Sequence, residues 1–341
     1  MYKQLFSLFK FYHVIIAYFR FQIMEQVLLK NPFVAFLKLI RVQNLLIVAI
    51  TMFCIKYFVF APINEYSKLT PFLFWILVVS TLFITAAGYI INDYFDVKTD
   101  KINRQTAVVL DITIKRRWAM ILHLVFNGIG LLLGLFLALK SHHLSLLLIQ
   151  LLSVVLLWFY STHFKRQLLI GNLVIAFLTA VVPLLPMVYE YYLTEKCDLL
   201  MAQMVLGDYF DLFPKVVIVY AIFAFLTSLT REIIKDLEDF KGDIQTGCKT
   251  MPIVWGIITS KVFVFFTTII IIGLLLLTTL KFYNDEKIVY VSYILTLLVA
   301  PLLILLFLLT RATTKEQFNR VSLLLKFVML FGIAFTFILK L

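Results

Sequence analysis

Nine long apolar stretches, separated by short polar segments, make up most of the chain beyond residue 32. A helix needs about 20 mostly apolar residues to cross the hydrocarbon core of a bilayer, and these stretches have roughly that length. The pattern therefore predicts an all-α, polytopic membrane protein with nine transmembrane helices. The expected spans are 33–60, 72–91, 118–139, 144–160, 168–189, 214–229, 262–280, 289–310 and 321–341.

Composition supports a membrane protein and excludes a soluble domain. The 341 residues are 62% hydrophobic and only 15% charged, with a mean hydropathy of +1.00. Soluble domains are about 45–50% apolar and about 25% charged. The net charge of +12 would fit nucleic acid, but this hydropathy argues against such a partner. Cys54, Cys197 and Cys248 have neither a disulfide framework nor a metal-ligand spacing.

The distribution of lysine and arginine predicts the orientation in the membrane. Most of the 31 basic residues lie before the first span or after even-numbered spans, so these segments are expected to be cytoplasmic and the C-terminus to lie on the opposite side. Residues 1–32 alternate basic and aromatic positions and are interpreted as an interfacial amphipathic helix or a poorly ordered extension. Residues 33–341 form one domain, with halves at about 33–166 and 167–310 and a ninth helix at 321–341.

Two acidic segments, 92–100 (NDYFDVKTD) and 235–243 (KDLEDFKGD), share one spacing. On a helix, positions i, i+3 and i+7 lie on one face. The first segment follows the second span and the other follows the sixth, so both are expected on the cytoplasmic side. Repeats related by an axis along the membrane normal would let the two faces meet. The aspartates with this spacing are Asp93, Asp96 and Asp100, and Asp236, Asp239 and Asp243.

Two facing carboxylate clusters predict a metal–diphosphate site. A charge run at a helix end is usually solvated, but the repetition at one spacing on one membrane side argues against that interpretation. Like charges on one face repel, so a cation is expected to compensate them. Oxygen ligands suit Mg²⁺ or Mn²⁺, and Mg²⁺ commonly binds carboxylates together with substrate phosphates. We therefore expect two or more Mg²⁺ ions, for which Mn²⁺ can substitute, to neutralise a departing diphosphate. An apolar, water-poor cavity would protect the carbocation that is left.

The motifs resemble those of the UbiA superfamily of intramembrane prenyltransferases. Segment 92–100, followed by Asn103-Arg104, resembles the family's NDxxDxxxD motif, and segment 235–243 resembles its DxxDxxxD motif. The resemblance covers about residues 33–341. Two further matches are Arg41-Val42-Gln43-Asn44, which is similar to the RPxN signature of the first helix, and the group Tyr160-Ser161, Lys165-Arg166 and Gly171-Asn172, which is similar to the segment joining helices four and five.

The resemblance implies nine helices around a central cavity that opens laterally to lipid, a prenyl diphosphate donor, a lipophilic acceptor and Mg²⁺. It assigns metal binding and catalysis to the aspartates, with Asp100 and Asp243 extending each cluster. No nucleic acid and no obligate protein partner are expected, and membrane lipid surrounds the chain. The implied metal ligands are Asn92, Asp93, Asp96, Asp100, Asp236, Asp239 and Asp243. The implied substrate-binding residues are Arg41, Asn44, Arg104, Lys165, Arg166, Arg231 and Lys235.

The acceptor is less narrowly defined by the residues. Val42 and Gln105 stand where the family often has proline. The stretch 231–243 looks most like the branch that makes digeranylgeranylglyceryl phosphate, whose acceptor is a glycerol phosphate carrying one prenyl ether. Arg231 and Lys249 would suit that phosphate. Aromatic acceptors of quinone synthesis, namely hydroxybenzoate, dihydroxynaphthoate and homogentisate, remain the alternative.

Two functions of other classes are alternatives for a chain with paired acidic motifs. Paired acidic sites would also serve a cation-coupled secondary transporter, but such sites usually lie near the bilayer midplane, whereas these motifs lie at helix ends. A non-catalytic scaffold that binds cations structurally is the third hypothesis. Of the scattered histidines, His163 is a candidate phosphate contact because it lies near Lys165 and Arg166, and Cys248 is interpreted as a packing thiol.

Overall fold

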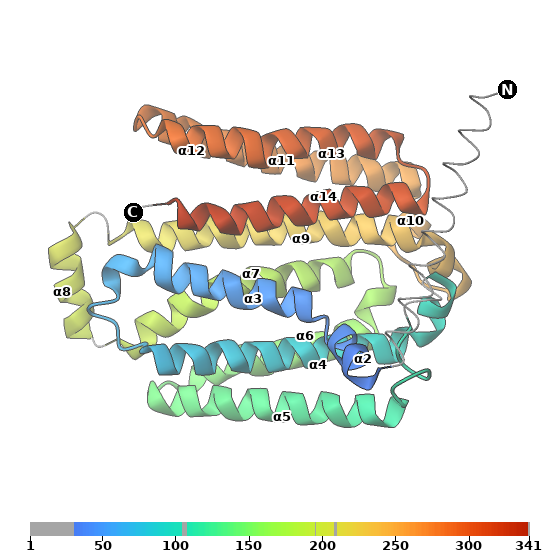
Figure 1. Ribbon diagram of the computed structural model, residues 1–341, viewed down its shortest axis with the longest axis horizontal. Helices are drawn as coiled ribbons and strands as arrows, with labels where there is room; N and C mark the ends of the chain where they lie inside the picture. Colours follow the sequence, from blue (N-terminus) through green and yellow to red (C-terminus); the bar gives the residue numbers. More distant parts are fainter. Residues whose placement is uncertain (1–30, 104–107, 195, 208–209, 340–341) are drawn as a thin grey trace.

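The computed structural model describes residues 31–103, 108–194, 196–207 and 210–339, which form a bundle of nearly parallel helices (Figure 1). The prediction for the N-terminal segment and the role predicted for Arg104 fall outside these residues. Within the described ranges, nine helical segments are long and apolar enough to cross a membrane, which confirms the predicted class. They are Val42–Val59, Pro71–Asn103, Arg116–Lys140, Leu144–Thr162, Ile170–Leu193, Leu212–Gln245, Ile257–Asn284, Ile288–Arg311 and Lys315–Phe337.

The predicted first span, 33–60, is interrupted. The chain forms α2 (Pro32–Leu39), turns at Ile40 and Arg41, and then forms α3 (Val42–Cys54), which continues as a π-helical turn, η1 (Ile55–Val59). Arg41 adopts a left-handed conformation with φ 51°, which ends the regular helix and which residues other than glycine adopt uncommonly. A prediction from hydropathy alone does not detect this break, because the residues on both sides of it are apolar.

The helices α4 (Pro71–Asn103) and α9 (Leu212–Gln245) are longer than the spans predicted from hydropathy. They contain 33 and 34 residues, which at 1.5 Å per residue corresponds to about 50 Å, whereas the hydrocarbon core is about 30 Å thick. Their C-terminal turns therefore extend past the apolar region and carry the two aspartate motifs. We call this end of the bundle the motif end and the opposite end the far end.

The long helices α4 and α9 lie on opposite sides of α3 and α7 (Figure 1). In Figure 1, α4 lies with α5 and α6 on one side, α9 and α14 lie beyond α3 and α7, and α11 to α13 form the outermost layer on the other side. Their bounds are α5 Arg116–Lys140, α6 Leu147–Thr162, α7 Ile170–Leu193, α8 Lys196–Leu206, α10 Met251–Val254, α11 Ile257–Asn284, α12 Ile288–Tyr293, α13 Ala300–Arg311 and α14 Lys315–Ala334, with short turns η2 Ala61–Ile63, η3 Leu144–Leu146, η4 Phe164–Arg166, η6 Ile294–Val299 and η7 Phe335–Phe337.

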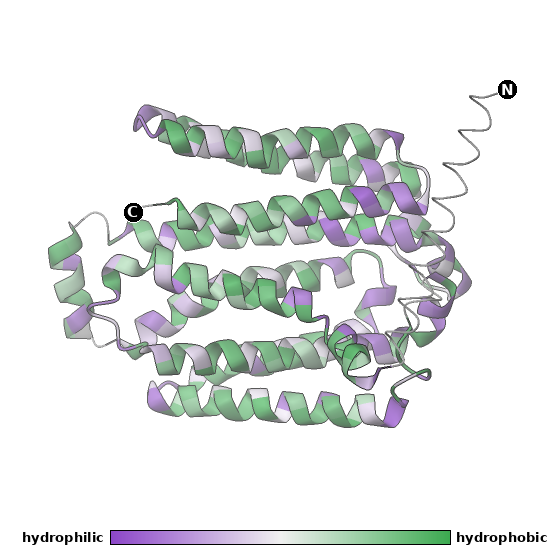
Figure 2. Cartoon of the chain, in the orientation of Figure 1, coloured by the Kyte–Doolittle hydropathy of each residue, from purple (hydrophilic) through white to green (hydrophobic). Residues whose placement is uncertain are grey.

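Separate apolar cores stabilise the two sides of the bundle. One is built around Leu77, Leu137 and Tyr189 on α4, α5 and α7, and a larger one around Ile233 and Leu302 includes residues of α9, α11, α13 and α14. Many large apolar side chains on the outer helices are exposed, as expected for lipid-facing surfaces. Figure 2 shows hydrophilic positions concentrated at helix ends, including the motif-end turns of α9 and α14. The division of the core leaves space near the bundle axis.

A buried ion pair joins η1 and α7 at the far end. Lys56 Nζ lies 2.6 Å from Glu190 Oε2, and the two side chains are 4% and 2% exposed. Lys56 also donates to Ser67 Oγ at 2.8 Å, and Thr194 donates to Glu190 Oε1 at 3.2 Å. These hydrogen bonds satisfy both charges inside the bundle and tie the loop after η1 to the end of α7.

Candidate active site

The two aspartate motifs are brought together by direct contact between the ends of α4 and α9. The Asn103 side chain accepts a hydrogen bond from Gly242 N at 3.0 Å and donates one to the Asp239 carbonyl at 3.2 Å. Thr99 donates to Thr246 at 3.3 Å one turn away. A Cβ at position 242 would lie 2.3 Å from Asn103 Oδ1, so only glycine permits this approach. The predicted meeting of the motifs at one membrane side therefore has a defined structural basis.

Basic side chains neutralise the first motif. Arg41 donates to Asp93 at 2.7 Å, and this contact depends on the turn between α2 and α3. Lys165, from the turn between α6 and α7, binds Asp96 and lies 3.4 Å from Asn92 Oδ1. The predicted compensation of the carboxylates is thus supplied by side chains from two other elements.

The second motif has a different set of partners. Asn172 of α7 donates to Asp236 Oδ2 at 2.8 Å, and Lys315 at the start of α14 lies 3.9 Å from Asp239 Oδ1. Asp243 is buried near the end of α9. The second motif is therefore held by α7 and α14, whereas the first is held by the turns flanking α3 and α6.

The Lys165 ammonium is stabilised in its charged form by the carboxylates around it. Burial alone would lower its pKa, but the Asp96 carboxylate, with smaller contributions from Tyr160 and Asp100, outweighs burial and raises the pKa of Lys165 above its ordinary value. Lys165 therefore remains protonated across neutral and mildly alkaline pH. It connects α6 and α7 to the first motif through charge.

The chemistry of these side chains fits a hard divalent cation. All donors from the motifs are carboxylate or amide oxygens, which Mg²⁺ prefers, and the Lys165 ammonium already bridges two of them, Asn92 Oδ1 and Asp96 Oδ2. Within the described ranges, no three Asp, Glu, His or Cys side chains are clustered closely enough to form a ready-made metal site. Binding of a metal would therefore require Lys165 and Arg41 to move from their carboxylates.

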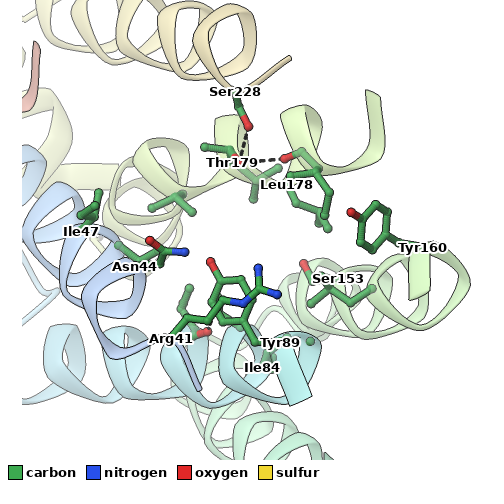
Figure 3. A pocket seen from close by; sticks show the side chains of 18 of the residues that line it. Arg41, Asn44, Ile47, Ile84, Tyr89, Ser153, Tyr160, Leu178, Thr179 and Ser228 are labelled. Carbon is green, nitrogen blue, oxygen red and sulfur yellow. Dashed lines mark hydrogen bonds between the residues drawn. The ribbon is translucent and has the colours of Figure 1, made fainter. Parts of the chain in front are cut away.

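A cavity of about 230 Å³ lies at the motif end, between α3, α4, α6, α7, α9 and α14. Figure 3 shows Arg41, Asn44 and Tyr89 on one side of it and Tyr160 on another. The Arg41 guanidinium lies 5.0 Å from the centre of the Tyr89 ring. Toward the bundle interior the lining becomes apolar, with Ile47, Val48, Ile149, Leu157, Leu178 and Val182.

A second, larger cavity of about 510 Å³ continues toward the far end. Its wall is mostly apolar and ends near Lys215, Lys281 and Lys287. The two cavities share the lining residues Ile47, Val48, Thr179, Val182 and Met329. Together they provide an apolar path that leads away from the carboxylates.

Some predicted residues lie outside this arrangement. Arg166 is exposed, and its carbonyl accepts from Lys249 N at 2.9 Å. Lys249 is itself exposed, and neither residue lines the cavity at the motif end. His163 is exposed and contacts Thr162. The predictions that Arg166 and Asp100 contact ligand are not tested by these contacts.

The sequence interpretation missed several residues that line the cavity. Tyr89 and Glu232 lie near the motifs in the chain but carry no distinctive spacing. Lys326 of α14 also lines the cavity, and its Nζ lies 3.4 Å from Asn44 Oδ1. An ionisable residue inside an apolar span is commonly functional, so the position of Lys326 in the ninth span was an available signal.

Comparison with known proteins agrees with this geometry. The model of the UbiA prenyltransferase family matches residues 45–332. The chain belongs to this family. Digeranylgeranylglyceryl phosphate synthase of Thermococcus sibiricus is 33% identical over 181 residues, which are 53% of this chain and 56% of that protein. The enzyme of the same name from Methanosphaera stadtmanae is 29% identical over 248 residues, 72% of this chain and 80% of that protein. The chain spans about half the length of the first of these relatives.

Solved structures share the fold. A digeranylgeranylglyceryl phosphate synthase structure matches with a TM-score of 0.55 at 24% identity, over 91% of this chain and 100% of that one. The apo UbiA homolog from Aeropyrum pernix K1 has a TM-score of 0.56 at 15% identity, over 83% and 97%. A UbiA homolog from Archaeoglobus fulgidus, bound to DMAPP and Mg²⁺, has a TM-score of 0.50 at 17% identity, over 89% and 99%. These matches confirm the predicted fold, and the family model confirms the predicted family.

Proposed function

We propose that this UbiA-family protein transfers a prenyl group from a prenyl diphosphate to a lipophilic acceptor within the membrane, in a reaction that depends on Mg²⁺. The observation that carries the proposal is the junction of the two aspartate motifs, through Asn103 and Gly242, at the polar end of an apolar cavity. This arrangement offers oxygen ligands at one end and a water-poor space for an isoprenoid at the other.

The motif residues would hold the metal and the diphosphate. When bound, Mg²⁺ would neutralise the charge of the leaving diphosphate; the homolog from Archaeoglobus fulgidus binds DMAPP together with Mg²⁺. Lys165 and Arg41, released from Asp96 and Asp93, would then donate to diphosphate oxygens. The proposed metal ligands are Asn92, Asp93, Asp96, Asp100, Asp236, Asp239 and Asp243.

The cavity walls would protect the prenyl cation that forms as diphosphate leaves. Apolar side chains exclude water, which would otherwise capture the cation. The rings of Tyr89 and Tyr160, at the boundary between the polar and apolar lining, can stabilise positive charge through their π-faces. The prenyl chains of donor and acceptor would occupy the apolar part of this cavity and the larger one beside it.

We further propose that the acceptor is a glycerol phosphate carrying one prenyl ether, as in ether-lipid synthesis. The support is the name shared by the related proteins and the excess of basic residues in the cavity. The motif end, with the N-terminus, would face the cytoplasm. Cation-coupled transport is disfavoured by family membership and by the position of the carboxylates at helix ends.

The decisive experiment is an assay of the purified protein in nanodiscs with Mg²⁺, prenyl diphosphates of several lengths and a panel of acceptors, read by mass spectrometry. Asp93→Ala and Asp236→Ala should reduce turnover at least about 100-fold while the protein stays folded, because each removes charge stabilisation of the leaving group. Asp211→Ala, which changes an exposed acid at the far end that lines neither cavity, is the matched control. Full turnover in either motif variant would refute the proposal, and prenylation of an aromatic acceptor alone would refute the choice of acceptor.

A further inference from the structure

A second group of cations lines the cavity beside the two motifs. Arg231 and Lys235 lie four residues apart on α9, so they occupy the same helical face. Lys326 approaches from α14, and Asn44 from α3. Two elements that are distant in the sequence, α9 and α14, therefore direct basic side chains to one cavity, and α3 adds the Asn44 amide.

The charges in this group do not balance. Glu232 is the acid that contacts it: Lys235 forms an ion pair with Glu232, and Arg231 Nη1 lies 3.6 Å from the same carboxylate oxygen. Lys326 contacts only the neutral amide oxygen of Asn44 among its hydrogen bonds in the described structure, at 3.4 Å. One carboxylate thus faces three cations, an imbalance of two charges in a partly apolar cavity.

A buried donor in this group also lacks an acceptor. Arg231 Nε is inaccessible to solvent and has no hydrogen-bond partner among the described residues. A buried donor left unsatisfied is unfavourable, and arginine presents its donors in a planar fork that matches phosphate oxygens. The excess charge and the unused guanidinium donor both indicate an anionic ligand.

This group adjoins the diphosphate site. Lys235 directly precedes Asp236 in the second motif, whereas Arg231 lies five residues before Asp236, about 7.5 Å along the helix axis at 1.5 Å per residue. Arg41 and Lys165 already contact Asp93 and Asp96, so the first motif has cations of its own. Arg231, Lys235 and Lys326 therefore offer cationic donors for an anion beside the two motifs.

We infer that Arg231, Lys235 and Lys326 form a binding site for the phosphate head group of the acceptor lipid, separate from the site that the aspartate motifs provide for the donor. The inference rests on the proposed function and deepens it. A phosphate group offers several oxygens that can accept hydrogen bonds from the Arg231 guanidinium and the two ammonium groups at once. The site would hold the acceptor head group next to the donor while the acceptor chain extends into the apolar cavity.

A binding experiment without Mg²⁺ or donor tests the site independently of turnover. The probes are geranylgeranylglyceryl phosphate, the corresponding alcohol without phosphate, and inorganic phosphate, each measured by thermal shift and calorimetry on the protein in nanodiscs. The lipid phosphate should bind at least about 10-fold more tightly than the other two, because a buried charge-assisted hydrogen bond contributes about that much. Equal binding of lipid phosphate and alcohol would overturn the inference, and equal binding of inorganic phosphate would show a free-anion site instead.

Variants at position 326 separate this role from packing. Lys326→Met keeps the length of the side chain and should remove the preference for the lipid phosphate, whereas Lys326→Arg should retain it. Lys140→Met, which changes an exposed lysine at the C-terminal end of α5 that lines neither cavity, is the matched control and should behave like the unmodified protein. An unchanged preference in Lys326→Met, with Tm preserved, would overturn the inference.

Kinetics distinguish failure of the inference from failure of the proposed function. In Lys326→Met the KM for the phosphate-bearing acceptor should rise at least about 10-fold, with the KM for the prenyl diphosphate unchanged, since the lost interaction is to the acceptor alone. An equal rise in both constants would assign Lys326 to the donor site and overturn the inference. Absence of prenyl transfer in the unmodified protein would refute the proposed function, and the binding experiment would still decide whether the phosphate site exists.

Discussion

Three carboxylates at the motif end each contact a particular nitrogen donor. Asp93 contacts Arg41, Asp96 contacts Lys165, and Asp236 accepts from the neutral amide of Asn172. These partners offset the repulsion between carboxylates that share a helical face. The consequence for function is competition, because a metal and the ammonium of Lys165 would bind the same oxygens.

Replacement of Lys165 tests this competition. In Lys165→Met the Asp96 carboxylate loses its cation, so we expect a lower Tm without metal and a larger rise in Tm on addition of Mg²⁺ than in the unmodified protein. Turnover should fall because Lys165 no longer reaches the diphosphate. Thermal unfolding with and without Mg²⁺ measures the effect, with the exposed Lys115→Met as control. A Mg²⁺ response equal to that of the unmodified protein would contradict the assignment of Asp96 to the metal site.

Gly242 is the residue at which added volume should matter most. Gly242→Ala would place a methyl group against the Asn103 amide, 2.3 Å from its oxygen, and overpacking of this kind costs about 1–3 kcal/mol. We expect lower stability and reduced turnover as α4 and α9 separate. Gly273→Ala in α11 is the control, since its Cβ meets nothing within 4 Å and alanine favours the helix by about 1 kcal/mol. Equal stability of the two variants, measured by thermal unfolding, would contradict the proposed contact.

At the scale of the elements, the two ends of the bundle are held by different interactions. At the motif end the side chain of Asn103 joins α4 to α9, whereas at the far end the Lys56–Glu190 pair joins η1 to α7. The π-helical turn η1 carries Lys56. Helices α4 and α9, which carry the two motifs, are thus linked at the motif end. Helix α7, which lines the cavity, is linked to η1 at the far end.

The buried pair should be sensitive to the loss of one partner. Removing one member of a buried ion pair commonly costs about 3–5 kcal/mol, because the other charge is left without compensation. We therefore expect Glu190→Gln to lower the Tm strongly, and the double replacement Lys56→Met/Glu190→Met to lower it less. The control is the pair of Lys68 and Asp198, which lie 3.3 Å apart at the same end and are 54% and 33% exposed. Disruption of this more accessible pair should cost at most about 1 kcal/mol. Similar costs for both pairs would show that Lys56 and Glu190 are not isolated from solvent.

At the scale of the whole molecule, the long helices α4 and α9 determine that one end is polar and reactive while the other is not. Both run from the far end to the motif end (Figure 1), so their C-terminal turns lie on one side of the membrane. The positive-inside pattern predicts that this side is the cytoplasm. This orientation stays a prediction.

Cys197 offers a direct measurement of that orientation. It lies exposed in α8 at the far end, whereas Cys54 and Cys248 are buried. If the motif end is cytoplasmic, a membrane-impermeant maleimide added to intact cells should label the protein at Cys197, and Cys197→Ser should abolish the labelling. Labelling only in inside-out vesicles would reverse the orientation.

The sequence by itself determined the class of the protein and the parts of its site that lie close together in the chain. Apolar runs defined nine helices because the bilayer requires about 20 apolar residues per span. The repeated spacing identified both motifs, and their positions after the second and sixth spans predicted that they share one membrane side. These features depend on short windows of residues, which hydropathy and helical periodicity describe well.

Only the tertiary structure decided which distant residues meet. It paired Arg41 with Asp93 through a left-handed turn inside a predicted span, joined Asn103 to Gly242, and brought Lys326 of the last span into the cavity. Such contacts depend on the rotation and packing of whole helices relative to one another, and no short window encodes that rotation. We therefore expect the substrate selectivity of the protein to depend on these long-range contacts.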